Sequence, residues 1–494
     1  MKYEAVIGLE VHAQLLTKSK MFCPCAAEYV QGKPNTRTCP VCLGMPGTLP
    51  VINKKAVEFV IMTGLALNCT IANETKFDRK NYCYPDLMKG YQISQYDQPI
   101  ACNGSLTVTT DNGEKLIRIN RVHLEEDVAK LQHHSSKDGS SSSSLVDINR
   151  SGLPLMEIVG EPDIRSAEEA RQYLIKLRSI LRYLKVSTGN MDQGSMRCDA
   201  NVSIRPVGTS DLFTRVEVKN MNSFRAVYRA IEYEIQRQIE CVQEDNPVVQ
   251  ETRGWMDTSG TTVSQRSKEY AHDYRYFPEP DLPLLFIEDA WREELFAGLP
   301  ELPEAKKRRF VMDYELPEYD AGLLTSSRSS ADFFEAVLQS TSTINSIKDR
   351  AKLIANWLLG DVSRILNAKR QEIDEVLLKP FHLAELIELV NQGSINGTTA
   401  KIILEEVFES GNSPKDIMVS KALNQISTSE VIDPLVEAAV QENPSAVQDY
   451  LGGKAGALRF LVGQVMKKSK GKANPAMVND ALIEKLKMSG ADVS

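Results

Sequence analysis

The stretch from Val6 to Gln14 reads VIGLEVHAQ and alternates apolar with polar residues. In a β-strand this alternation sends successive side chains to opposite faces, so the apolar residues would face a core. Glu10, His12 and Gln14 would then share the other face. A carboxylate, an imidazole and an amide in one row could form the floor of a metal or phosphate site. A half-solvated strand has the same pattern, so this stretch alone leaves both interpretations open.

Three later segments repeat the pattern. The first contains His123, Glu125 and Asp127, the second runs from Asp199 to Arg205, and the third runs from Arg215 to Asn220. Each alone fits a solvated strand face. Four such strands with carboxylates, two of which also carry Arg or Lys, favour the lining of a cleft, in which carboxylates hold Mg²⁺ and cations neutralise phosphate oxygens.

The phosphate chemistry would not use a familiar nucleotide-binding loop. The chain contains neither GxxxxGK[ST] nor GxGxxG, so any ATP site is of another type. Histidine is an uncommon ligand of Mg²⁺. His12 would therefore orient a metal-bound water or favour Mn²⁺.

A cysteine quartet lies close to the N-terminus. Cys23 and Cys25 precede the Cys-x-x-Cys pair formed by Cys39 and Cys42. Two close pairs separated by a short loop are typical of a four-thiolate zinc site, and such a site has no open position for a substrate. We therefore predict a structural Zn²⁺. A redox pair is the alternative, but no thioredoxin-like pattern surrounds these residues.

Composition predicts a multidomain α+β protein. The chain has 494 residues, nine cysteines and a formal net charge of −8, which argues against a generally basic nucleic-acid binder. No apolar run is long enough to span a membrane, and the first strand begins almost at the N-terminus, without a leader. We expect reduced thiols and a cytoplasmic location.

Two changes in residue pattern divide the chain. Residues 1–293 show short strand-like runs and a few long helices, which predicts a mainly antiparallel β catalytic domain. Helical spacing dominates after the proline-rich linker near residue 300. A break at residues 411–414 separates a helical domain, 294–411, from a small helical tail domain, 412–494.

Local signals refine the first domain. Ser166 to Lys185 and Asn222 to Gln243 have helical spacing, with Ser166 and Asn222 as the expected N-caps. Ser135 to Ser144 contains seven serines and lies between strand-like runs. We interpret it as a hairpin tip or lid, although a passive loop fits equally well.

The tail has its own charge. Between Leu451 and Ser494 there are eight Lys or Arg residues and three Asp or Glu residues, a local balance of +5. Basic residues that follow an amphipathic helix can track phosphates. A solvated tail remains the alternative.

Another loop region interleaves aromatic and charged residues. It includes Phe77 to Tyr82 and Gln92 to Asp97. Such a region suits phosphate contact and base stacking, and it suits an interface with another subunit equally well.

Together these segments resemble the GatB family, one of the protein components of tRNA-dependent amidotransferases. The resemblance covers nearly the whole chain and rests on long motifs. They are VIGLEVH (6–12), FDRKNY (77–82), YQISQYD (91–97), HLEED (123–127), VDINRSGLPLMEIV (146–159), RCDANVS (197–203), EVKN (217–220), DYRYFPEPD (273–281) and FLVGQVMK (460–467).

The resemblance implies a cradle-shaped catalytic domain, a helical domain and a YqeY-like tail that contacts tRNA. It implies that ATP phosphorylates the side chain of glutamate or aspartate misloaded onto tRNA(Gln) or tRNA(Asn), and that ammonia then displaces the phosphate. The ammonia would come from a partner amidase subunit, GatA, through a channel. A small third subunit, GatC, would complete a heterotrimer.

The resemblance also implies roles for individual residues. Metal or phosphate roles, in part catalytic, fall on Glu10, His12, Glu126 and Glu217, with Glu125 and Asp192 as further metal candidates. Arg79 and Lys80 would lie at the channel mouth, where Lys80 could pair with a gating carboxylate. Nucleotide or acceptor-end contacts fall on Ser151 and the residues up to Leu155, and on Arg197, Asn201, Arg205, Lys219 and Asn220. The cysteine quartet matches the zinc-carrying branch of the family.

Two rival hypotheses stay open at this stage. One is a non-catalytic RNA-binding scaffold that uses the zinc knuckle and the basic tail. The other is a metal-dependent phosphodiesterase that acts on RNA. The sequence does not determine whether glutamyl-tRNA, aspartyl-tRNA or both would be the substrate.

Overall fold

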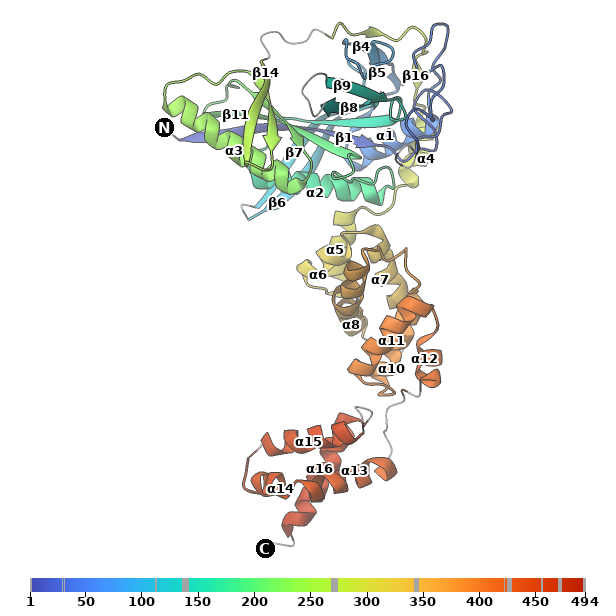
Figure 1. Cartoon of the computed structure of the whole chain (residues 1–494), viewed down its shortest axis with the longest axis vertical. Helices are drawn as coiled ribbons and strands as arrows, with labels where there is room; N and C mark the ends of the chain where they lie inside the picture. The colour runs from blue at the N-terminus through green and yellow to red at the C-terminus, as the bar shows by residue number, and fades with distance from the viewer. Residues whose placement is uncertain are drawn as a thin grey trace. The chain divides into compact units, whose positions relative to one another are not determined.

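The computed structural model describes residues 2–491 except 29, 31, 112, 136–141, 268–273, 342–345, 422, 424–428, 455 and 470–472. Backbone contacts divide the chain into two compact units, Met1–Pro303 and Glu304–Ser494. The first unit combines a large sheet with helices, and the second is built from helices (Figure 1). The fold is therefore α+β, as the composition predicted.

The first unit is organised around a nine-stranded sheet. In spatial order its strands are β14 (Thr261–Ser267), β13 (Glu251–Met256), β12 (Val216–Met221), β11 (Met196–Pro206), β1 (Tyr3–Gln14), β10 (Pro154–Gly160), β7 (Gly113–Glu126), β6 (Ala101–Thr110) and β2 (Thr70–Ile71). The described neighbours pair antiparallel, except β12 with β13, which pair parallel. The predicted antiparallel character is confirmed.

One face of this sheet carries the core. Leu9 and Val11 of β1 are buried and cluster with apolar residues of three helices: α1 (Lys54–Ala66), α2 (Ala167–Tyr183) and α3 (Phe224–Gln243). Helices α2 and α3 run side by side along the sheet in Figure 1 and contact each other. Burying one face in this way leaves the alternating polar side chains on the other face.

The N-terminal caps of the two long helices test two predictions from the sequence. The Ser166 hydroxyl accepts the amide of Glu169 at 3.1 Å, so the predicted N-cap of α2 is confirmed. The predicted cap of α3 is wrong by one residue, since Ser223 and not Asn222 accepts the amide of Ala226, at 3.1 Å. A cap side chain reaches the amide three residues later, which only Ser223 does here.

Smaller elements complete the unit. They are the sheet β15 (Phe277–Pro278), β4 (Asp78–Asn81) and β5 (Tyr91–Ser94), the pair β16 (Leu285–Phe286) and β3 (Glu74–Thr75), the hairpin β8 (Lys130–Ser135) and β9 (Ser142–Asp147), and helix α4 (Asp289–Ala297). Strands β8 and β9 pair antiparallel, and residues 136–141 of the serine-rich segment, for which a hairpin tip or lid was predicted, lie outside the described residues.

The second unit contains two apolar clusters. The first contains Phe310, Phe334 and Leu404, and the second contains Val436, Leu461 and Leu482. Its helices are α5 (Pro303–Tyr314), α6 (Glu318–Leu324), α7 (Arg328–Ser340), α8 (Ile347–Trp357), a π-helical turn η1 (Leu358–Val362), α9 (Ser363–Lys369), α10 (Pro380–Asn391), α11 (Gly397–Ser410), α12 (Pro414–Ser420), α13 (Ser429–Glu442), α14 (Pro444–Leu451), α15 (Gly456–Lys468) and α16 (Pro475–Ala491). In the described part of the chain, no helix has the length and apolarity needed to cross a membrane.

Candidate active site and zinc centre

The polar face of the large sheet gathers histidines and carboxylates from three adjacent strands. In the β1–β10 pairing His12 lies opposite Glu157, and in the β10–β7 pairing Glu157 lies opposite His123. His12 Nε2 is 3.6 Å from Glu157 Oε2 and 3.7 Å from Glu125 Oε1. Potential ligand atoms of His12, Glu125 and Glu157 all lie within 4.8 Å of one another. We call these three residues the acidic cluster.

Burial makes the charges of the acidic cluster strongly interdependent. Burial alone would lower the pKa of His12, but Glu157 and then Glu125 raise it to about 9. Burial alone would raise the pKa of Glu157, yet His123 and His12 hold that pKa well below its usual range. Burial, and secondly Glu157, raises the pKa of Glu125. His12 and His123 therefore favour the charged form of Glu157, whereas burial disfavours the charged form of Glu125.

A second group of polar residues extends the same face towards β12. Asn201 donates to Glu10 Oε1 at 2.9 Å. Lys219 Nζ is 2.7 Å from Asp199 Oδ2 and 3.2 Å from Glu217 Oε1. Burial raises the pKa of Glu10, and Glu157, Asp199 and Glu217 raise it further. Glu10 therefore lies in the combined field of both groups, and the structure brings together the carboxylates predicted on β1 and β12.

Lys80 of β4 adds a cation beside the acidic cluster. Its ammonium lies 5.1 Å from the ring centre of Tyr274 and 6.0 Å from that of Tyr82. Burial would lower the pKa of Lys80, but Glu125 and Glu157 raise it on balance. This half-buried cation near two carboxylates suits contact with an anionic or phosphorylated substrate.

Glu126 lies apart from the acidic cluster although it follows Glu125 directly. Adjacent residues of a strand face opposite ways. Glu126 Oε1 accepts the amide of Ile93 at 3.0 Å and pairs with Lys89. Ser151 lines a small pocket with Glu126. The structure thus places these two predicted residues together, at a different location from Glu10 and His12.

Other predicted residues have partners of their own. Arg79 makes two 2.7 Å hydrogen bonds to the buried Glu279 and so ties β4 to β15. Arg197 donates to Asp127 at 3.3 Å, and Arg205 donates to Glu4 at 2.7 Å.

Two more predicted residues lie in exposed turns or irregular backbone. Asp192 is exposed in the turn before β11. Asn220 is exposed with a φ of 65° at the β-bulge between β11 and β12. The structure does not bring Asp192 into the acidic cluster.

One residue of the polar face, Glu157, had no role in the sequence-based prediction. His123 and Asp199 were predicted on cleft-lining strand faces but were given no individual role. A signal was present for Glu157, because a carboxylate inside the apolar run Pro154–Gly160 is rarely buried without a partner. Its partners could not be predicted, since they depend on strand register.

The four cysteines form a compact group beside the sheet. Their sulfurs all lie within 4.8 Å of one another, and those of Cys39 and Cys42 are 3.8 Å apart. A tetrahedral zinc ion with Zn–S bonds of about 2.3 Å would hold its sulfurs about 3.8 Å apart. A hydrogen bond from Cys23 lowers the pKa of Cys42 to about 4, while that pair raises the pKa of Cys23. The quartet therefore fits Zn²⁺.

Comparison with known proteins identifies the family. Residues 5–293 match the GatB/GatE catalytic domain, and residues 332–486 match the GatB domain. The chain belongs to the GatB family.

Relatives match over their full length and carry one name. The B subunit of the aspartyl/glutamyl-tRNA(Asn/Gln) amidotransferase from Dehalococcoides mccartyi strain CBDB1 is 57% identical over 97% of this chain and 98% of its own length. Its counterparts of the same name from Caldanaerobacter subterraneus and Thermodesulfovibrio yellowstonii are 54% and 50% identical, over 98% and 99% of this chain and all of their own lengths. The match to a catalytic domain disfavours the scaffold hypothesis.

The cysteine geometry generates one prediction. Cys39→Ser should lose bound zinc and lower the thermal unfolding temperature, because a zinc site with three thiolates binds more weakly and the knuckle loses its crosslink. Elemental analysis and a thermal melt measure both effects. Cys83→Ser, at an exposed cysteine outside the quartet, is the control. Full zinc retention in Cys39→Ser would refute the assignment.

The acidic cluster generates a prediction about metal binding. Glu157→Gln should weaken Mn²⁺ binding at least about tenfold, because the amide removes a charged ligand that contacts both histidines. Electron paramagnetic resonance titration of free Mn²⁺ measures the affinity. Glu161→Gln, whose carboxylate bonds Asn120 outside the cluster, is the matched control. Equal affinity in both variants would contradict a cation site here.

Proposed function

We propose that this chain is the kinase and transamidase subunit of a tRNA-dependent amidotransferase. In this function it converts glutamyl-tRNA(Gln), aspartyl-tRNA(Asn) or both to the amidated forms. The observation that carries the proposal is the acidic cluster on the polar sheet face, flanked by Glu10, Glu217 and the cations Lys80 and Lys219. Family membership supports the same assignment.

The chemistry requires such a face. A carboxylate is a poor electrophile because its oxygen leaves badly and its charge repels nucleophiles. Transfer of the terminal phosphoryl group of ATP to that oxygen creates a good leaving group, which ammonia displaces to give the amide and inorganic phosphate. Fixed cations and a bound divalent ion offset the charge that develops on the phosphoryl oxygens.

The acidic cluster suits a divalent cation. Glu125 and Glu157 offer the hard oxygen ligands that Mg²⁺ prefers, and His12 adds an imidazole that suits Mn²⁺ better. Burial and, secondly, like-charge repulsion raise the pKa of Glu10 and Glu125, and a cation would stabilise their charged forms. When bound, the metal would supply charge neutralisation, while Glu10 and Glu217 would accept hydrogen bonds from its water shell.

The remaining assigned residues take supporting roles in this proposal. Arg197, Asn201 and Lys219 line the route from the acidic cluster towards β12 and would contact nucleotide or the acceptor end, with Arg205, Asn220 and Ser151 as outer contacts. Glu126 and Asp192 are weaker candidates, because Glu126 already pairs with Lys89 and Asp192 lies in an exposed turn. Arg79 would hold strand β4, which carries Lys80, through its hydrogen bonds to Glu279. The quartet Cys23, Cys25, Cys39 and Cys42 would hold a structural Zn²⁺.

The domain plan and partners follow the family. Three separate apolar clusters support a catalytic cradle (1–293), a helical domain (294–411) and a YqeY-like tail (412–494), but Leu302 packs with the first cluster and Ile417 belongs to the second, which moves both boundaries towards the C-terminus. The protein would assemble with the amidase GatA and the small subunit GatC, receive ammonia from glutamine hydrolysis and act in the cytoplasm.

Reconstitution tests the proposal. The chain, its amidase and small-subunit partners, glutamine, ATP, Mg²⁺ and mischarged tRNA should together yield amidated tRNA. Omission of ATP should leave the tRNA mischarged. RNA cleavage by the isolated chain, without amide formation by the complex, would instead favour the phosphodiesterase hypothesis.

Two substitutions locate the chemistry. Glu10→Ala or Glu217→Ala should abolish ATP-dependent amide formation, while glutamine hydrolysis by the partner persists in part, because the glutaminase site lies in another subunit. Amidated tRNA and released glutamate are measured in parallel. Glu114→Ala, at an exposed glutamate of β7, is the control. Normal amide formation in both variants would refute the site assignment.

The tail offers a separate prediction for tRNA binding. Truncation would remove buried Leu461 and Leu482, so a single charge change is the cleaner test. Lys467→Gln, at an exposed position, should weaken tRNA binding and reduce the slope of log affinity against log salt by about 1. The control is Lys485→Gln, because Lys485 already pairs with Glu437 at 3.0 Å. An unchanged slope in Lys467→Gln would contradict a phosphate contact.

A further inference from the structure

One connection of the large sheet differs from the other described pairings. Strands β12 and β13 pair parallel, and helix α3 forms the crossover between them. The register places Glu217 opposite Thr252. A parallel pair cannot be fixed by a tight turn, so contacts of the crossover helix must set its register.

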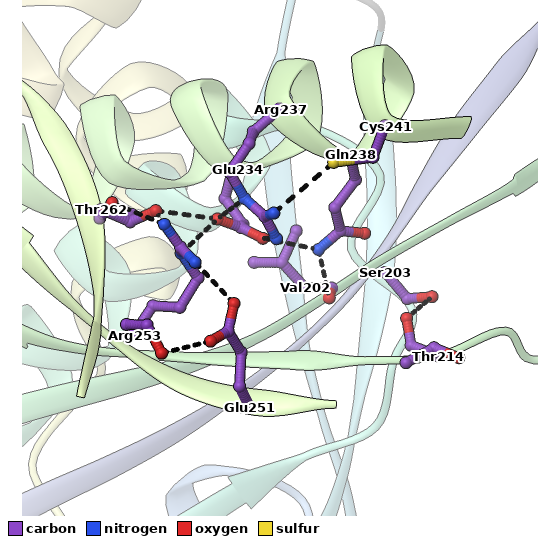
Figure 2. Close-up of polar contacts among 11 residues, drawn as sticks. Val202, Ser203, Thr214, Glu234, Arg237, Gln238, Cys241, Glu251, Arg253 and Thr262 are labelled. Carbon is purple, nitrogen blue, oxygen red and sulfur yellow. Dashed lines mark hydrogen bonds and ion pairs between the residues drawn. The ribbon is translucent and has the colours of Figure 1, made fainter. Parts of the chain in front are cut away.

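A buried polar network joins this helix to β13 and β14. Glu234 of α3 has no exposed side-chain surface and accepts two hydrogen bonds from Arg237, at 2.6 and 3.0 Å. It also accepts one from Gln238 at 2.9 Å and one from Thr262 at 3.0 Å. Gln238 in turn donates to the carbonyl of Val202 in β11, at 3.0 Å (Figure 2).

Arg253 of β13 is held at the centre of this network. Its guanidinium donates to the side chain and the carbonyl of Thr262, at 2.8 and 2.7 Å, and pairs with Glu251. Its Nε is 3.6 Å from Glu234 Oε2. Figure 2 shows Arg253 between Glu234 and Glu251. Strand β13 is thus linked to the helix by the ion pair of Arg253 with Glu234 and, through Thr262 of β14, by hydrogen bonds.

The residue before Arg253 faces the other side of the sheet. Thr252 is buried, and its hydroxyl donates to Glu217 Oε2 at 2.8 Å. The other oxygen of Glu217 lies 3.2 Å from Lys219. Because neighbouring residues of a strand point to opposite faces, any shift of Arg253 would displace Thr252 and its contact with Glu217.

Stability alone does not explain a charged network at this place. Well-packed apolar residues often stabilise a fold as much as a buried ion network does, because burying charges costs desolvation free energy. What the ion network adds is a more specific geometry. A network with several matched partners has one favourable arrangement, whereas an apolar contact tolerates sliding. Here that specificity determines which residue of β13 lies next to Glu217, namely Thr252.

We propose that Thr252 is a positioning residue for Glu217, and that the buried pair of Glu234 and Arg253 holds the strand that carries Thr252. This inference rests on the proposed function, in which Glu217 acts in the acidic face. Thr252 does not touch the reacting atoms in this role. It sets the direction of the carboxylate that does.

Two substitutions of Thr252 separate positioning from packing. Thr252→Val keeps the volume but removes the hydroxyl, and should lower kcat of amide formation by the reconstituted complex about tenfold or more. Thr252→Ser keeps the hydroxyl but leaves a cavity, and should stay within about threefold of wild type. A packing role predicts the reverse order. KM for mischarged tRNA and partner glutamine hydrolysis should be unchanged in both variants.

Thr261→Val is the matched control, because the same change removes a hydroxyl that bonds Ser259 in a neighbouring turn. A normal kcat in Thr252→Val, or a Ser variant worse than the Val variant, would overturn the inference while the wild-type complex still forms amide. No amide formation by the wild-type complex would instead overturn the proposed function.

A double-mutant cycle tests the link through β13. Glu234→Gln should lower kcat, and combining it with Thr252→Val should cost little more than the larger single effect, because both act through Glu217. If the double variant instead lowers kcat by the product of the two single reductions, Glu234 acts independently of Thr252, and that part of the inference is overturned.

Discussion

The register of β1 against its two neighbours is the constraint on which the rest of the molecule depends. Leu9 and Val11 are buried on the helix-covered face, so a shift by one residue would expose them and bury Glu10 and His12 in the core. The apolar face therefore fixes the polar face. The same register places His12 opposite Glu157 on one side and Arg197 on the other.

Much of this arrangement could be predicted, because period-two alternation is a local property. The sequence predicted Glu10 and His12 on one strand face and Glu125 on another, and the structure shows both. It gave Glu126 the same metal role as Glu10, but Glu126 points the other way on β7 and pairs with Lys89. The cysteine quartet was also predictable, since its ligands are close in sequence. Its sulfurs come together as the spacing indicated.

What could not be predicted depends on pairing between distant segments. Glu157 lies about 145 positions along the chain from His12 and becomes its neighbour only through the β1–β10 register. Arg79 belongs to a motif that was expected at a channel mouth. Its guanidinium instead donates to Glu279, two hundred residues later in the chain. The prediction of the α3 cap failed for a local reason. Two adjacent residues, Asn222 and Ser223, can both cap a helix, and only the backbone geometry determines that Ser223 does so.

The two charged groups of the first unit illustrate opposite uses of burial. Glu234 is enclosed and satisfied by hydrogen bonds from three residues, Arg237, Gln238 and Thr262, so its charge is compensated within the protein. In the acidic cluster, His12 lies 3.6 and 3.7 Å from the two carboxylates, and Glu10 and Glu125 have raised pKa values. A compensated network gains nothing from a ligand and serves to hold geometry. The acidic face is compensated only in part, because Glu10 and Glu125 keep raised pKa values despite the nearby His12, so a bound divalent cation would stabilise their charged forms.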